Sequence, residues 1–115
     1  MRCSLVVVAT AFVSLSSCDV VTSRYATLDD ARKDRLFERG WLPDILPASS
    51  RDIRVSNDLD VNHSEGEFSF DLADFEVFAA RLRSRGDTKF EYSEGEQTWI
   101  FTCDSYRGHC RYSTR

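Results

Sequence analysis

The sequence predicts one small α+β domain in which two helices pack on an antiparallel sheet of about five strands. Its 115 residues are enough for a single hydrophobic core and no more. Apolar residues recur first at helical spacing and later at every second position, which is typical of strands. Two cysteines near the C-terminus are spaced to join neighbouring strands of a hairpin. We expect the element order α-β-β-α-β-β-β.

The N-terminal segment, residues 1–17, has the order of a bacterial signal peptide. A charged Arg2 precedes an apolar run at 5–13, and small serines follow. The run is too short for a permanent membrane span, which needs about 20 apolar residues. A signal peptide would direct the chain out of the cytoplasm, into an oxidising compartment in which disulfides form.

The four residues Leu15-Ser16-Ser17-Cys18 resemble the lipobox of bacterial lipoproteins. The resemblance implies that the leader is cut before Cys18, whose thiol carries a diacylglyceryl group and whose amine is acylated, for example with palmitate. We therefore expect a lipid anchor on the periplasmic face of the inner membrane or on the outer membrane. Residues 18–26 would be the lipidated N-terminus and a short stem, and 27–115 the globular domain. The alternative is an ordinary secretory signal in which Cys18 is incidental.

The first helix is expected over residues 28–39. Thr27 can cap its free N–H groups, while Asp29 and Asp30 favour the positive end of the helix dipole. Gly40 supplies the left-handed conformation that commonly ends a helix.

A proline-containing loop follows at residues 40–50 and carries several large apolar side chains. We expect it to pack on the domain, because a buried loop anchor is the commonest use of such residues. The alternative is a recognition surface built on Trp41, Leu42 and Pro43, since aromatic residues dominate interface hot spots.

Strand spacing begins at Ile53, where apolar and polar residues alternate as far as Val61 with an interruption at Asn57. A second strand is expected at 67–70, with Phe68 and Phe70 facing the core.

The second helix is the element most clearly marked in the sequence. Asp71 is the expected N-cap, and Phe70 before it can pack on Phe75 as a hydrophobic staple. Apolar residues at three- and four-residue spacing continue to Leu82, and Gly86 is the expected stop.

The last part of the chain is expected to be a meander of three strands, beginning around Phe90. If the strands at 99–103 and 110–114 pair, Cys103 lies opposite Cys110, and a disulfide is expected. Cys18 would be lipidated and Cys3 lost with the leader, so these two thiols remain. The alternative is a metal or redox site using both thiols and His109, although the spacing does not fit a zinc ribbon.

Composition argues against several functions. The net charge of −4 disfavours nucleic acid, whose binding requires clustered Lys and Arg. No nucleophile, base and orienting group can be recognised, so we predict no catalytic residues, no cofactor and no metal. The leading hypothesis is a non-enzymatic module that binds another envelope protein. The rival is a small envelope enzyme or ligand carrier with a site between the Trp41 loop and the sheet.

Several short motifs, taken together with the lipobox, resemble a family of small uncharacterised bacterial lipoproteins with a YbbD head domain. They are Thr27-Leu28, Glu38-Arg39-Gly40-Trp41-Leu42-Pro43, Leu46-Pro47-Ala48-Ser49, Asp52-Ile53, Trp99-Ile100-Phe101 and Gly108-His109-Cys110. The resemblance implies a fold and a location in the envelope, and it implies no catalytic residue.

Overall fold

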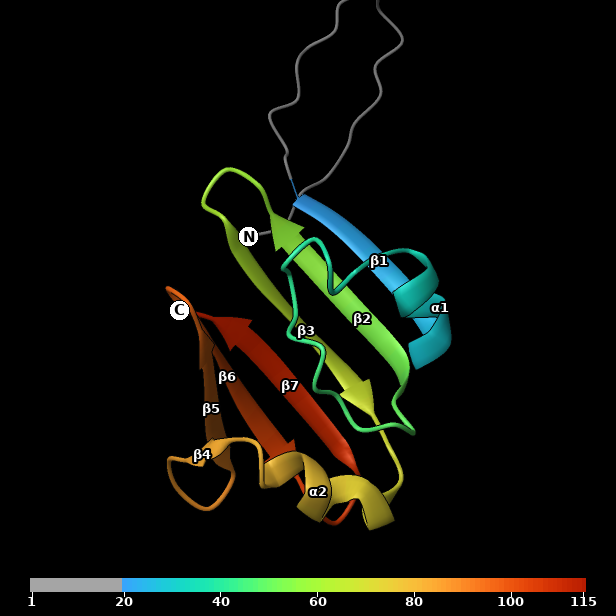
Figure 1. Ribbon diagram of the computed structural model, residues 1–115, viewed down its shortest axis with the longest axis vertical. Coiled ribbons are helices and arrows are strands. Elements are labelled where there is room, and N and C mark those ends of the chain that lie inside the picture. Colours follow the sequence, from blue (N-terminus) through green and yellow to red (C-terminus); the bar gives the residue numbers. More distant parts are fainter. Residues whose placement is uncertain (1–19) are drawn as a thin grey trace, which may run out of the picture.

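The computed structural model describes residues 20–115. It consists mostly of one antiparallel sheet of seven strands, in the order β1-β2-β3-β7-β6-β5-β4 (Figure 1). The strands are β1 Val20–Thr27, β2 Arg51–Asp58, β3 His63–Ser69, β4 Arg83–Ser84, β5 Lys89–Glu94, β6 Gln97–Asp104 and β7 His109–Thr114. The helical segments are α1 Leu28–Lys33, the 3-10 turn η1 Leu72–Asp74 and α2 Phe75–Ala79.

The last strand lies in the middle of the sheet. β7 pairs with β3 on one side and with β6 on the other, so it joins an N-terminal group of three strands to a C-terminal group. The register between β6 and β7 places Cys103 opposite Cys110, as the sequence predicted, and Phe101 opposite Tyr112.

The prediction for the N-terminal residues of the domain was wrong. The expected stem to residue 26 is strand β1, which pairs along its length with β2. Tyr25 is its one buried side chain, and its hydroxyl donates to Asp34 Oδ2 at 2.6 Å. Burial and this hydrogen bond raise the pKa of Tyr25. An edge strand that buries one residue shows too little alternation to be recognised in the sequence.

Both helices are shorter than predicted, and the fold is therefore mostly sheet rather than evenly α+β. Thr27 caps α1 as expected, accepting from the N–H of Asp30 at 3.1 Å, but the helix ends at Lys33. Arg35, two residues later, adopts a positive φ of 59°, which is incompatible with a continuing helix.

The second helix begins later than predicted. Asp71 makes no side-chain capping bond and instead accepts from Arg51 Nη1 at 3.0 Å. The rings of Phe70 and Phe75 do stack, with centroids 6.1 Å apart, as a staple requires. The helix ends at Ala79 because Arg83 and the residue after it pair with β5.

The core lies on one face of the sheet, where the loop of residues 34–50 and the helical segments contact it (Figure 1). Leu36, Leu42 and Leu46 of the loop are buried there. The indole N–H of Trp99 in β6 donates to the carbonyl oxygen of Trp41 at 2.9 Å, which fixes the loop to the sheet. From α2, Phe78 meets Phe101 edge to face with centroids 5.4 Å apart.

Candidate functional site

In the described part of the chain, the helical segments and the loop of residues 34–50 pack on the core face of the sheet and leave the opposite face uncovered. Strand alternation directs polar side chains to it, and the burial pattern of β2, β3 and β7 leaves every one of them exposed or half-buried. We call this surface the outer face. Its central members are Arg54, Ser56, Glu65, Glu67, His109, Arg111 and Ser113.

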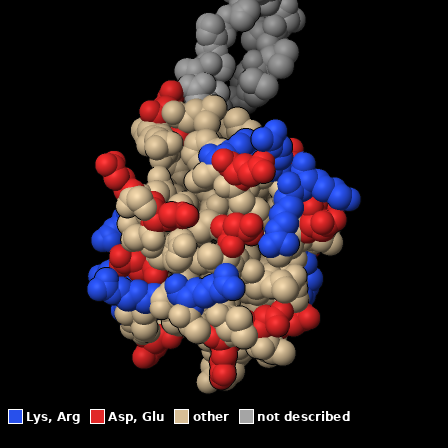
Figure 2. All heavy atoms as spheres, viewed as in Figure 1, with Lys and Arg blue, Asp and Glu red and all other residues tan. Residues whose placement is uncertain are grey.

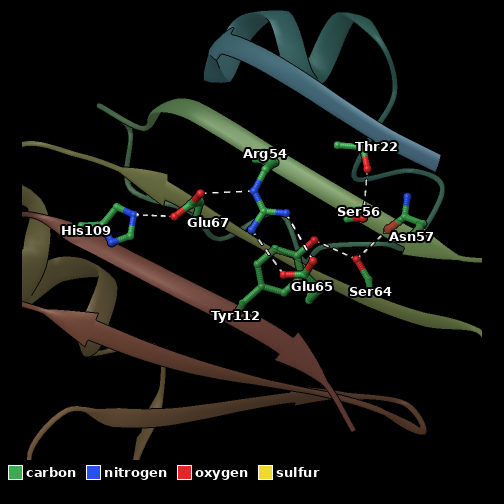
Figure 3. Close-up of polar contacts among 9 residues, drawn as sticks. All are labelled: Thr22, Arg54, Ser56, Asn57, Ser64, Glu65, Glu67, His109 and Tyr112. Carbon is green, nitrogen blue, oxygen red and sulfur yellow. Dashed lines mark hydrogen bonds and ion pairs between the residues drawn. The ribbon is translucent and has the colours of Figure 1, made fainter. Parts of the chain in front are cut away.

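Arg54 is the centre of an ion-pair network on the outer face (Figure 3). Its Nε donates to Glu67 Oε2 at 3.2 Å, and its Nη1 and Nη2 donate to the two carboxylate oxygens of Glu65 at 3.2 and 3.3 Å. The side chain of Arg54 is only 21% exposed. The guanidinium thus occupies a fixed position between the two carboxylates.

The network continues to His109 on β7, whose Nε2 lies 3.1 Å from Glu67 Oε1 (Figure 3). The hydrogen bond from Arg54 holds the pKa of Glu67 below its usual range, and His109 adds to this effect. Partial burial of Glu67 opposes the shift without cancelling it. Glu67 therefore remains ionised and connects the side chains of β2 and β7.

A hollow of about 580 Å³ adjoins the network at the β6–β7 loop. Glu67, His109 and Arg111 line one part of it, and Tyr106 and Arg107 of the loop line another. Its volume is in the range of small-molecule sites, about 300–1,000 Å³. The disulfide lies next to it, since Cys103 also contributes to the lining.

A second polar cluster, of Asn57, Ser64 and Tyr112, is buried on the core side of β2, β3 and β7 (Figure 3). Ser64 Oγ donates to Asn57 Oδ1 at 2.6 Å and lies 2.7 Å from the Tyr112 hydroxyl. Because Ser64 has one proton to give, Tyr112 is the donor in the second bond. Burial raises the pKa of Tyr112 well above its ordinary value.

The predicted disulfide is confirmed: Cys103 and Cys110 are joined across the β6–β7 hairpin. Their sulfurs bind each other and are not available as metal ligands beside His109. Among residues 20–115 no group of three His, Cys, Asp or Glu side chains is placed to hold a metal ion.

Of the three residues predicted as a recognition surface, only Trp41 is partly exposed, whereas Leu42 and Pro43 are buried. The cavity between this loop and the sheet, lined by Trp41 with Arg39, Asn62 and Gln97, is only about 70 Å³. Cys18, the predicted lipidation site, lies outside the described residues.

Sequence reasoning considered His109 only as part of an alternative metal or redox site, and it missed Arg54, Glu65 and Glu67. Charged residues at alternate strand positions are the signal for such a network. That signal does not say which strands are neighbours, however, and His109 and Glu67 are 42 positions apart in the chain.

The charge on the core side of the molecule, opposite the outer face, is mixed. Basic and acidic side chains lie interspersed over the face shown in Figure 2. Surface pairs such as Arg32 with Asp44, 3.1 Å apart, contribute to this mixture. In the described part of the chain, no helix is both long and apolar enough for a membrane span.

Residues 19–69 match the YbbD head domain family. The match extends from β1 through α1 and the Trp41 loop to the end of β3, so it includes Arg54, Glu65 and Glu67. The late motifs around Trp99 and Gly108 lie outside it. No curated protein and no solved structure matches the chain. The chain thus resembles the YbbD head domain in the N-terminal half of its sheet.

Proposed function

We propose that this protein is a lipid-anchored lipoprotein of the bacterial envelope, tethered through Cys18, and that it is a non-enzymatic module that binds another envelope protein through the outer face. The observation that carries the binding proposal is this uncovered face with its fixed ion-pair network. A partner meeting the network would find Arg54, Glu65 and Glu67 already oriented, so little side-chain entropy would be lost on binding.

Position 111 is a suitable place to test the binding surface. Arg111 is exposed on the central strand β7, beside Glu67. A photoreactive residue at this position, in the full-length protein in cells, should form the same covalent adduct repeatedly. The same residue at Glu38, an exposed position in the loop that contacts the core face, is the matched control.

The adduct should also depend on the network. We expect Glu65→Gln with Glu67→Gln to remove it, because the partner would lose both carboxylates. An adduct formed equally from positions 38 and 111, or unchanged in the glutamine variant, would contradict the proposed surface.

The anchor has its own test, the variant Cys18→Ser. Labelling cells with palmitate should mark the wild-type protein and leave the variant unmarked. Without its acyl chains the variant should leave the membrane fraction, because these chains supply about 0.8 kcal/mol per buried CH₂. A variant that still fractionates entirely with the membrane would argue against lipid anchoring.

A ligand carrier or small enzyme is the second candidate function. A site between the Trp41 loop and the sheet has little support, since the cavity there is about 70 Å³. The hollow of about 580 Å³ beside Glu67 and His109 favours this candidate instead. Chemical-shift mapping of the protein with a panel of small anions and amines would test it. Shifts centred on His109, absent in Glu67→Gln, would support a carrier.

A further inference from the structure

Exposed apolar side chains gather at the end of the sheet where β1 begins. In the described residues, six large apolar side chains are at least half exposed, and three of them lie here. Leu59 and Val61 occupy the tip of the β2–β3 hairpin, with 53% and 67% of their surface exposed. Val21 on the neighbouring strand is 50% exposed. We call residues 59–62 the hairpin tip.

The hairpin tip is held next to the start of β1 (Figure 1). Val20 pairs with Asp58, the residue immediately before Leu59. Cys18 is two residues before Val20, and two residues of chain span at most about 7 Å. The sheet register therefore keeps Leu59 and Val61 close to any lipid carried by Cys18.

We propose that the hairpin tip inserts Leu59 and Val61 into the interfacial layer of the membrane that holds the lipid anchor. This inference rests on the proposed lipidation of Cys18. With the lipid and the tip as two points of contact, the sheet would stand on the bilayer by this end. The outer face would then point along the membrane, toward neighbouring envelope proteins.

Charges near the tip limit the depth and the type of membrane. Asp58 and Asp60 flank Leu59, and Glu94 and Glu96 line the same hollow as Val61. The Asp58 carboxylate accepts from the Asp60 N–H at 3.1 Å and so folds back onto the turn. Carboxylates are costly to desolvate and are repelled by anionic headgroups. Insertion is therefore shallow and strongest in neutral lipid.

The proposal can be tested by placing an environment-sensitive fluorophore at the tip. In the mature lipidated protein Cys3 has been removed with the leader, Cys18 carries lipid, and Cys103 and Cys110 are joined, so the variant Val61→Cys would present a single reactive thiol. Tyr106→Cys is the matched control, because Tyr106 is 90% exposed in the β6–β7 loop at the opposite end of the sheet. Both labelled proteins would be reconstituted into phosphatidylcholine vesicles, with and without a nitroxide-bearing lipid.

Flotation with the vesicles tests the anchor, and the fluorophore tests the tip. We expect both proteins to float, a blue-shifted emission at position 61 that the nitroxide lipid quenches, and neither effect at 106. Floating protein with equal, unquenched emission at both positions would overturn the inference while leaving the anchor intact. Equal quenching at both positions would also overturn it. Protein that does not float would overturn the lipid anchor itself.

Discussion

The atoms around Gly66 leave no room for a side chain at this position. It lies in β3 opposite Val55 and Tyr112, and a Cβ added there would be 1.9 Å from the carbonyl oxygen of Arg54 and 2.9 Å from the Tyr112 ring. The absence of a side chain lets the ring pack against the backbone and reach Ser64. Gly66 thus supports both the buried polar cluster and the network on the outer face.

We predict that Gly66→Ala lowers the free energy of unfolding by about 3 kcal/mol or more, because the backbone of β2 or β3 must move. Gly95→Ala is the matched control. Gly95 has a positive φ of 64° but open space around it, so only about 1–2 kcal/mol of backbone strain is expected. Urea unfolding followed by circular dichroism measures both. Equal losses would contradict the steric explanation.

Tyr112 should make the protein sensitive to alkali. Its pKa is raised by burial, whereas in the unfolded chain it ionises near its ordinary value of 10.0. The unfolded state therefore loses this proton first, and stability that is complete below about pH 10 declines as the pH rises toward the folded pKa. The expected loss is about 1.4 kcal/mol at pH 11.

Tyr112→Phe removes this titration. At neutral pH it costs about 1 kcal/mol, because Ser64 loses a hydrogen-bond donor. The advantage of the wild type over the variant should then fall between pH 9 and 11, vanish and slightly reverse by pH 11, as measured by urea unfolding at each pH. A constant difference would show that Tyr112 does not titrate as proposed.

At the scale of elements, the sequence predicted the strands with strong alternation and misjudged the other elements. The C-terminal meander was readable because alternate residues such as Trp99, Phe101 and Cys103 are all buried. β1 could not be predicted, because it is held by backbone pairing with β2 and has no alternating row of buried side chains. Both helices were predicted to be too long, because helical apolar spacing continues beyond their actual ends. The first is followed by the positive φ of Arg35, and the second by strand β4, which pairs with β5.

The β6–β7 hairpin is the element in which sequence and structure agree most closely. The disulfide closes a short loop with a sequence separation of 7. On the chain-entropy account, such a closure stabilises the fold by about 2.5 kcal/mol. Cys110 is fully buried and Cys103 nearly so, which restricts access of a reductant to the folded protein.

We therefore predict that the double variant Cys103→Ala, Cys110→Ala unfolds in urea with a free energy about 2.5 kcal/mol lower and keeps its fold. Wild-type protein should react slowly with a thiol reductant in buffer and rapidly in urea. Mass spectrometry after alkylation follows that reaction. A bond reduced equally fast under both conditions would contradict its buried position.

At the scale of the whole molecule, the fold depends on a strand that the chain supplies last. β7 carries the contact between Phe68 and Cys110 on one side and between Phe101 and Tyr112 on the other. The resemblance to the YbbD head domain ends at residue 69, before β7, so the matching segment alone lacks the strand that completes its sheet. β1 and β4 are edge strands, each paired on one side only.

Position in the sheet, rather than strand length, should therefore decide which terminal strand the fold can lose. We predict that a chain ending at Arg107, without β7, does not fold, because the two groups of strands lose the neighbour they share and Phe101 loses its ring contact with the buried Tyr112. A chain lacking residues 20–26 loses most of the longer strand β1 but keeps β2 to β4 continuous, so it should fold with reduced stability. The double cysteine variant controls for the disulfide that the first truncation also removes. Amide exchange measured by NMR distinguishes the outcomes: slowly exchanging amides in β5 and β6 of the chain that ends at Arg107 would show that the C-terminal strands fold without β7 and would overturn this view of the sheet.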